Sequence, residues 1–456
     1  MAPFGLVSLL RVRLSAACLV PPAIRRSLAP PFPGNGWAPL RSLRAPLRAL
    51  AVAAVAAVVL APLQGLAQDV DPGRSDETIT LSGILSGTVF LQDATFGLGN
   101  GQQAQFVSDE LAGWWHGGDV RNTRVTVGIR GPSVAGDWQS NATVELDFFG
   151  GFNGAGNFGD EQPVPRLRLA FVDLTNGRTT FRAGQGWSLT LGQIPVSASH
   201  IGFPLGWGTG GFIGWRFPGL WLKHRLSPAN ARTSLEAEFA VLRGSWVDEE
   251  AADGISAGEA GLPQLEGRLN LRGATGDDGR WNAYVVGHFD SKDLNGARPE
   301  GTPEPPDDDL DSWAFEAGGN VEAGRVRLQG NAYTGKAMGH HFASLIQFGD
   351  IASWGAWGQA GFNLTPRWSV WGYVGFEDPD DDDVAAAALV ADADEAVFVR
   401  GGGGIESLLF APMLRYRSGP YQAGLEWLRS RTSYLTPTGE TELTGNQLAF
   451  SVGYEF

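Results

Sequence analysis

The residues with the clearest chemical potential are arginines that recur at alternate positions of short segments. Successive side chains of an extended segment point to opposite faces, so these arginines share the polar face of each segment. Nine of them form a candidate basic ladder: Arg124, Arg130, Arg166, Arg168, Arg182, Arg268, Arg272, Arg325 and Arg327. Guanidinium groups bind carboxylates in bidentate geometry and favour anion entry into a pore. We therefore predict that the ladder binds substrate.

A second interpretation of these arginines is structural. Several acidic residues occupy the same polar phase: Glu145, Asp147, Glu236, Glu238, Glu266 and Glu316. Ion pairs between the two sets would stiffen the wall without selecting a solute. Anion guidance and wall stiffening are both open, and they are compatible.

Catalytic and metal signatures are weak in comparison. The sequence holds six scattered histidines: His116, His200, His224, His288, His340 and His341. It has no HExxH or CxxC pattern, and an adjacent histidine pair is more often a loop feature than a metal site. The sequence therefore predicts no catalytic residue, no metal site and no cofactor.

The elements that would position these side chains are about sixteen segments of alternating polarity. In the segment 137–148, for example, Val144 and Leu146 alternate with Glu145 and Asp147. The segments have about 9 to 15 residues each, enough to cross a bilayer at a tilt. The predicted fold class is all-β: a transmembrane antiparallel β-barrel of porin type with about 16 strands.

The connections between these segments alternate between short turns and long loops, as in membrane barrels. The long ones are 93–120, 149–164, 189–211, 244–263, 291–312, 335–353, 378–406 and 432–444. Three of them, 244–263, 291–312 and 378–406, carry runs of acid, which either bridge to lipopolysaccharide or a neighbouring subunit through divalent cations or are simply solvated. The segment 189–211 is instead Gly-rich and without acid. We expect it to fold inward as a constriction loop, with an exposed apical loop as the alternative.

The two ends of the chain predict its destination. The last strand alternates Leu448, Phe450, Val452 and Tyr454 with small or polar residues and ends on Phe456. A terminal aromatic resembles the assembly signal of bacterial outer-membrane proteins. We predict a multi-pass protein of the Gram-negative outer membrane, with Phe456 as its membrane-assembly signal.

Residues 1–67 have the pattern of a leader, with seven arginines, no acid and an apolar run followed by a small-residue cleavage site. Cleavage after Ala67 would leave a short periplasmic N-terminal segment, 68–77, and a barrel over 78–456. Of the 34 basic residues seven lie in the leader, which leaves 27 against 49 acidic residues and a net charge near −22. That charge excludes nucleic acid as a partner. The single cysteine, Cys18, lies in the leader, so the remaining chain has no thiol chemistry.

Several segments resemble the DcaP-like trimeric outer-membrane porin family. They are Pro165–Ala170, Ala183–Ser188, Asn363–Tyr373 and Gly424–Trp427, within a resemblance that spans most of 78–456. The resemblance implies a sixteen-stranded homotrimer with an inward loop that takes up small anionic solutes such as dicarboxylates. It also implies lumen-facing positions for Arg166, Arg168 and Arg182. Some members have a periplasmic coiled coil, for which the segment 68–77 is too short.

The sequence thus predicts a porin, not an enzyme, for passive diffusion of small hydrophilic solutes with a preference for anions. Two alternatives stay open. One is an outer-membrane barrel hydrolase, and the other is a plugged barrel with a structural or adhesion role.

Overall fold

A computed structural model describes the chain from residue 78 to its end, with gaps at 135, 154–160, 245–261, 277–278, 294–308, 348, 391–402 and 437. The expected leader 1–67 and segment 68–77 lie outside the described residues. Nearly all of the described chain is β-strand. None of its helices has the length and hydropathy of a membrane-spanning helix.

Seventeen strands are described. They are β1 (Thr78–Phe96), β2 (Val107–Asp119), β3 (Arg124–Val134), β4 (Trp138–Asp147), β5 (Arg166–Thr175), β6 (Thr179–Trp187), β7 (Arg216–Arg225), β8 (Thr233–Leu242), β9 (Leu262–Thr275), β10 (Gly279–Asp293), β11 (Asp309–Ala323), β12 (Val326–Lys336), β13 (Ala352–Asn363), β14 (Trp368–Pro379), β15 (Gly404–Ser418), β16 (Tyr421–Thr436) and β17 (Gly439–Glu455). The helices are η2 (Gly101–Gln103), η4 (Gly339–His341), η5 (Ser344–Ile346) and α2 (Asp381–Val390).

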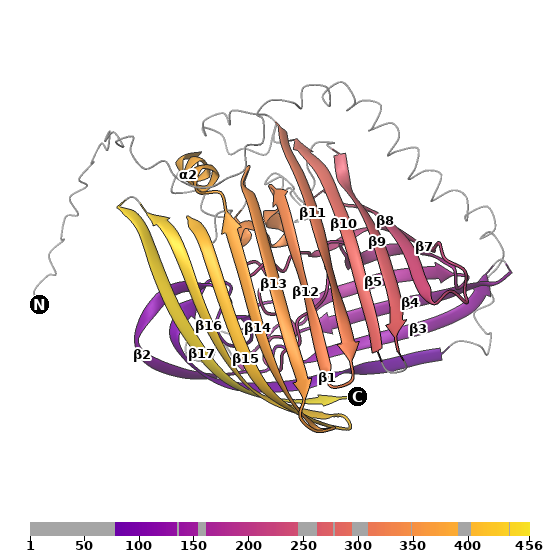
Figure 1. The fold of residues 1–456 in the computed structure, drawn as a ribbon, viewed down its shortest axis with the longest axis horizontal. Helices are drawn as coiled ribbons and strands as arrows, with labels where there is room; N and C mark the ends of the chain where they lie inside the picture. Colours follow the sequence, from indigo (N-terminus) through magenta and orange to yellow (C-terminus); the bar gives the residue numbers. More distant parts are fainter. Residues whose placement is uncertain are drawn as a thin grey trace, which may run out of the picture. The chain divides into compact units, whose positions relative to one another are not determined.

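Sixteen of these strands close into one antiparallel ring. Each strand from β3 to β17 pairs with the next, and β1 closes the ring between β17 and β3. The remaining strand, β2, pairs with the second half of β1 directly beyond the end of β3. The pairs β1–β2 and β1–β3 therefore make one interrupted strand position, and the predicted barrel of about 16 strands is confirmed. Figure 1 shows β10 to β17 side by side as one curved wall.

The two faces of the wall differ as the alternation predicts. On β1, Leu81 and Val89 are 62% and 61% exposed, whereas Thr88 and Gln92, which point the other way, are 4% and 1% exposed. Such an apolar outer surface on a closed ring of paired strands is typical of a barrel that spans a membrane, where closure of the ring leaves no open sheet edge in the hydrocarbon. The prediction of an outer-membrane barrel is confirmed.

The C-terminal strand closes the ring. Backbone bonds link Phe456 to Gly83 of β1 in both directions, at 2.9 Å and 3.1 Å. Ser451 and Thr88 also join their hydroxyls at 2.7 Å across this seam. The last strand therefore completes the barrel at the first.

Two of the expected long loops are mostly strand. The segment 432–444 is occupied by the ends of β16 and β17, which stay paired up to Thr436 and Gly439, and the segment 93–120 contains β2. The segment 93–120 lacks clean alternation, since Trp114, Trp115 and His116 are followed by two glycines. It nevertheless forms β2, because the free edge of β1 offers unpaired backbone groups along Thr88–Phe96. Backbone pairing with β1 therefore makes β2 a strand although its sequence lacks alternating polarity.

Candidate solute-binding site

The segment between β6 and β7, residues 188–215, extends into the space that the strands enclose. Residues 202–214 are buried without interruption. The amide of Val196 donates to Gln359 of β13, and that of Gly211 donates to Glu377 of β14, both at 2.8 Å. Because β13 and β14 lie across the ring from β6 and β7, this inward segment bridges the two sides of the lumen.

Glycine permits this path. Gly206, Gly208 and Gly211 have φ of +76°, +78° and +76°, a region open to glycine at little cost. A Cβ at Gly211 would lie 2.2 Å from the backbone nitrogen of Ala356 on β13. The inward segment can therefore approach the wall only through bare backbone.

A buried carboxylate anchors the middle of the inward segment. Glu426 of β16 accepts hydrogen bonds from Ser197 and Ser199 and lies 2.9 Å from Nδ1 of His200. The other ring nitrogen of His200 is 2.9 Å from the carbonyl of Ala104. In a catalytic triad the serine and the acid contact different ring nitrogens. Here Ser199 and Glu426 both lie 2.9 Å from Nδ1 of His200, so this serine–histidine–glutamate group anchors the segment and does not have the geometry of a triad.

A second inward segment, residues 337–351 between β12 and β13, packs on the first. The ring of Phe342 lies 4.5 Å from that of Trp215 and 4.9 Å from that of Trp207, which is fully buried. Phe342 has φ of +60°, and four other non-glycine residues of this segment also have positive φ. Such backbone persists only where its surroundings enforce it.

Arginines and carboxylates of β3, β4 and β5 form a bonded group beside the inward segment. The fully buried Asp147 receives two hydrogen bonds from Arg166, at 3.0 Å and 2.8 Å, and one from Arg168 at 2.8 Å. Arg168 also donates to Glu145 at 2.7 Å. Arg124 lies 3.8 Å from Glu145 and donates to the carbonyl of Ile201 at 3.3 Å. Three predicted ladder residues thus lie together.

Arg216, the first residue of β7, joins this group without a counter-charge. It is 6% exposed, and among the described residues it has no hydrogen-bond or ion-pair partner. Its guanidinium carbon lies 5.0 Å from the ring centroid of Trp187 and 4.4 Å from that of Trp215. Arg166 lies 5.8 Å from the same Trp215 centroid, so the two guanidinium centres are at most the sum of these distances, 10.2 Å, apart.

We call this group the basic cluster and define it as Arg124, Arg166, Arg168 and Arg216 with Glu145 and Asp147. Its four guanidinium groups face two carboxylates, which leaves an excess of two positive charges. The side chains of Arg124 and Arg166 are 21% and 20% exposed. The excess charge is therefore in contact with the lumen.

The other ladder residues are dispersed. Arg182 makes a bidentate pair with Asp173, with both bonds at 2.8 Å. Arg272 and Arg327 pair with Glu236 and Glu322 at 3.5 Å and 3.2 Å. These are pairings of the kind that the second interpretation of the arginines expects.

Three ladder residues have other environments. Arg268 donates to the carbonyls of Leu189 and Leu191 at 3.1 Å and 3.0 Å, so it positions the inward segment. Arg130 and Arg325 are exposed, and neither has an ion-pair partner in the described part of the chain. The nine arginines therefore do not form one continuous ladder.

Sequence reasoning did not single out Arg216. It directly follows the Gly-rich inward segment, at the first position of a strand, where alternation does not yet fix the side-chain direction. The one available signal is its place between Trp215 and Phe217, because aromatic neighbours can hold a guanidinium without a carboxylate.

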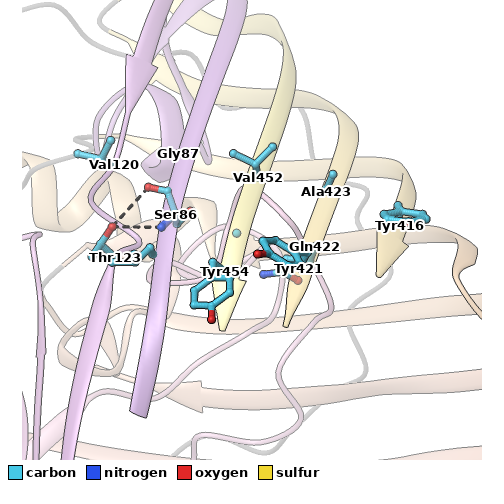
Figure 2. A pocket seen from close by; sticks show the side chains of 12 residues that line it. Ser86, Gly87, Val120, Thr123, Tyr416, Tyr421, Gln422, Ala423, Val452 and Tyr454 are labelled. Atoms are coloured by element: carbon cyan, nitrogen blue, oxygen red, sulfur yellow. Dashed lines mark hydrogen bonds between the residues drawn. The ribbon is translucent and has the colours of Figure 1, made fainter. Parts of the chain in front are cut away.

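The outer wall carries a cavity of about 560 Å³, lined by β1, the β2–β3 connection and β15 to β17. Figure 2 shows Tyr421, Val452 and Tyr454 around it, with Ser86 and Thr123 joined by hydrogen bonds of 3.2 Å and 3.4 Å. It lies on the outward face of these strands, so it is separate from the lumen.

Comparison with solved structures gives the same fold. The outer membrane channel DcaP of Acinetobacter baumannii matches with a TM-score of 0.60 at 15% identity, over 85% of this chain and 100% of that chain. Salmonella typhi OmpF, in complex with daunomycin, matches with a TM-score of 0.51 at 12% identity, over 83% of this chain and 97% of that chain. No family model and no curated protein sequence matches. The expected resemblance to DcaP-like porins is therefore confirmed at the level of the fold.

Proposed function

We propose that this barrel is a porin through which small hydrophilic solutes diffuse passively, with a preference for anions and for dicarboxylates in particular. The observation that carries the proposal is the excess of two positive charges in the basic cluster. A porin-type fold and an inward segment beside that cluster support it.

The charge arrangement suits a solute with two negative groups. Arg166 and Arg216 both lie over Trp215 and are at most 10.2 Å apart. A dicarboxylate close to this pair would neutralise both excess charges. Entry requires no conformational cycle, since the inward segment limits the size of the solute and the arginines offset part of its desolvation.

Liposome swelling with matched solutes tests this function. Succinate and its neutral diamide, succinamide, are close in size but differ by two charges. We expect proteoliposomes with the purified barrel to admit succinate faster, and planar bilayers to show a reversal potential of anion-selective sign. Faster entry of succinamide, or a cation-selective reversal potential, would refute the anion preference.

A plugged barrel is the second candidate, and the burial of residues 202–214 favours it. Stepwise conductance of the purified barrel distinguishes the two functions. A porin gives discrete current steps, whereas a plugged barrel gives none.

We further propose that the barrels form homotrimers in the outer membrane. The cavity in the outer wall supports this, because an adjacent barrel would fill an apolar hollow that lipid chains pack less well. Native mass spectrometry in mild detergent should find three chains, and a strictly monomeric species would refute it.

Acidic side chains of α2, such as Asp381 and Asp382, would bind lipopolysaccharide through divalent cations, so chelation should release that lipid.

Residues 1–67 are proposed to be removed after Ala67. N-terminal sequencing of the protein from outer membranes should then begin at Gln68.

A further inference from the structure

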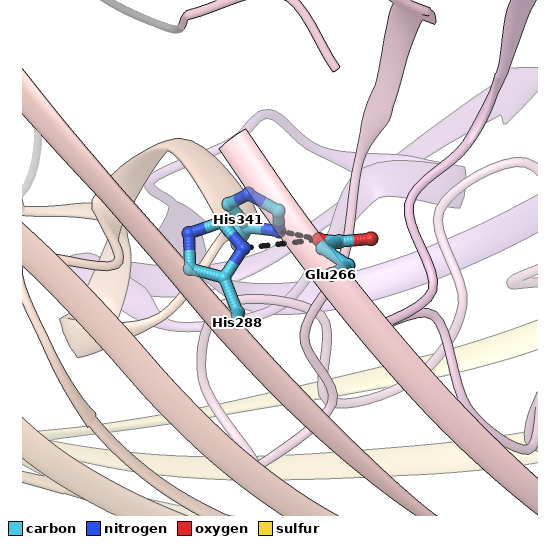
Figure 3. A group of neighbouring side chains, drawn as sticks. All are labelled: Glu266, His288 and His341. Carbon is cyan, nitrogen blue, oxygen red and sulfur yellow. Dashed lines mark hydrogen bonds and ion pairs between the residues drawn. The ribbon is translucent and has the colours of Figure 1, made fainter. Parts of the chain in front are cut away.

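Three buried side chains with metal-ligand chemistry, none of them a member of the basic cluster, converge on one point. They are Glu266 of β9, His288 of β10 and His341 of η4, which are 1%, 5% and 2% exposed. Figure 3 shows both imidazoles directed at one carboxylate oxygen of Glu266. Nδ1 of His288 lies 3.0 Å and Nδ1 of His341 lies 3.9 Å from that oxygen. All three ligand atoms lie within 4.8 Å of one another.

These separations are close to those of a metal centre. Zinc binds imidazole nitrogen and carboxylate oxygen at about 2.0–2.2 Å, which places tetrahedral ligands about 3.4 Å apart. Small side-chain adjustments bring the three atoms to that spacing. Two imidazoles and one carboxylate are also a recurrent zinc-binding set that leaves the fourth position to water.

Neighbouring groups orient these ligands. Nε2 of His341 lies 2.6 Å from the amide oxygen of Gln264, so this nitrogen carries the proton and Nδ1 keeps its lone pair. The Thr190 hydroxyl lies 2.9 Å from that Nδ1 and 2.8 Å from the Ser188 hydroxyl. When Thr190 donates its proton to Ser188, the Nδ1 lone pair is available to a metal ion. Such outer contacts typically fix metal-binding imidazoles.

Glu266 and His288 complete the set. The second oxygen of Glu266 accepts from the amide of Leu189, which leaves the first oxygen to the two imidazoles. Nε2 of His288 is buried and has no hydrogen-bond partner in the described chain. A buried imidazole whose sole polar contact is a shared carboxylate oxygen is poorly satisfied as a hydrogen-bonding group. As a ligand it would be satisfied.

We propose that Glu266, His288 and His341 bind one divalent transition-metal ion, with Zn²⁺ the best fit. Imidazole ligands suit zinc and its neighbours, whereas Ca²⁺ and Mg²⁺ prefer all-oxygen sites. The ion would hold the second inward segment through His341 and the first through the Leu189 bond to Glu266. The ion would therefore link both inward segments to β9 and β10. This structural role is separate from solute binding.

The test uses the full barrel, purified, treated with EDTA and titrated with Zn²⁺ in excess Mg²⁺, which saturates acidic oxygen sites. We expect one Zn²⁺ per chain by calorimetry and by elemental analysis. X-ray absorption of the zinc-loaded barrel should show two imidazole ligands. His288→Gln should remove stoichiometric binding, and Gln264→Ala should weaken it about 10–100-fold. His340→Gln is the matched control and should bind as the unchanged protein does.

Three results would overturn the proposal. They are the absence of stoichiometric binding by the unaltered barrel, unchanged binding by His288→Gln, and an absorption spectrum without imidazole ligands. The spectrum and the stoichiometry need no variant, so they decide the question even where His288→Gln fails to fold. Heat-modifiable mobility on gels reports folding of each variant.

Discussion

Replacing Arg216 by methionine tests the link between charge and selectivity. Methionine has a similar length and no charge, and it removes one of the two excess positive charges of the basic cluster. Because Arg216 has no polar partner in the described chain, the change breaks no hydrogen bond. We expect lower anion selectivity together with unchanged or higher stability.

The size of the effect can be worked out for an anion in contact with Arg216. We take the anion to lie about 5 Å from the Arg216 guanidinium. With the dielectric constant of a water-filled pore, each charge contributes about 0.8 kcal/mol to a monoanion and about 1.7 kcal/mol to a dianion. Since 1.4 kcal/mol is a factor of ten, Arg216→Met should lower relative permeability about fourfold for chloride and about 15-fold for succinate.

Reversal potentials in salt gradients measure these ratios. Arg325→Gln is the matched control: it makes the same change in net charge at an exposed turn between β11 and β12, four strands along the ring from β7. We expect it to leave the ratios near their original values, because distant exposed charges are screened by salt. Equal shifts in the two variants, or no shift in Arg216→Met, would refute the role of the cluster. Urea unfolding should show Arg216→Met stabilised by about 1 kcal/mol or more, since an unpaired buried charge is removed.

Three further substitutions test the inward segment and the closing strand. Glu426→Ala strips the anchor of its carboxylate, so we expect about 3–5 kcal/mol lower stability by urea unfolding and larger, noisier single-channel currents. Gly211→Ala places a Cβ 2.2 Å from a backbone nitrogen of β13, so the inward segment must shift and the conductance should change. Gly358→Ala on β13 is the control: its Cβ would lie in open space, and the conductance should stay the same. Phe456→Ala should reduce the amount of folded barrel in outer membranes if Phe456 is the assembly signal, and equal loss in Phe450→Ala would contradict that role.

The barrel wall was predictable because alternation is a local property. Glu145 and Asp147 share one face and Val144 and Leu146 the other whatever their neighbours are, and the short turns mark where the strands reverse. The strand β2 was not predictable, since its pairing depends on the free edge of β1 and not on its own pattern.

The arginine partners were not predictable for a different reason. The alternation of polar and apolar residues predicts that Arg166 and Arg168 share the lumen face of their strand. Which carboxylates they contact depends on the register between strands. Between β4 and β5 the register shifts at Glu145 and Leu146. That irregularity lets Arg168 reach both Glu145 and Asp147, and no local sequence feature announces it.

The inward segments show the same division. Glycine content marks the segment 189–211 as unusual, whereas 337–351 reaches positive φ at Phe342 and Ile346 without glycine. In the proposed metal site, Glu266 and His288 face each other across the paired strands β9 and β10, and packing of the second inward segment adds His341. The spacing of these three residues along the sequence follows no strand or helix period. The site can therefore be found only from the folded structure.

The unpartnered Arg216 favours a functional explanation over a structural one. The barrel supplies a carboxylate to Arg182, Arg272 and Arg327, where pairing rigidifies the wall. A structural residue at position 216 would gain from being apolar, since it sits between Trp187 and Trp215 and desolvation of an unpaired charge is costly. Positions where local physical rules are broken without compensation are expected at functional sites. Contact with Trp187 and Trp215 offsets part of the cost at Arg216, and a bound anion would offset more. Selectivity should therefore be measured at the basic cluster and not at the paired arginines of the wall.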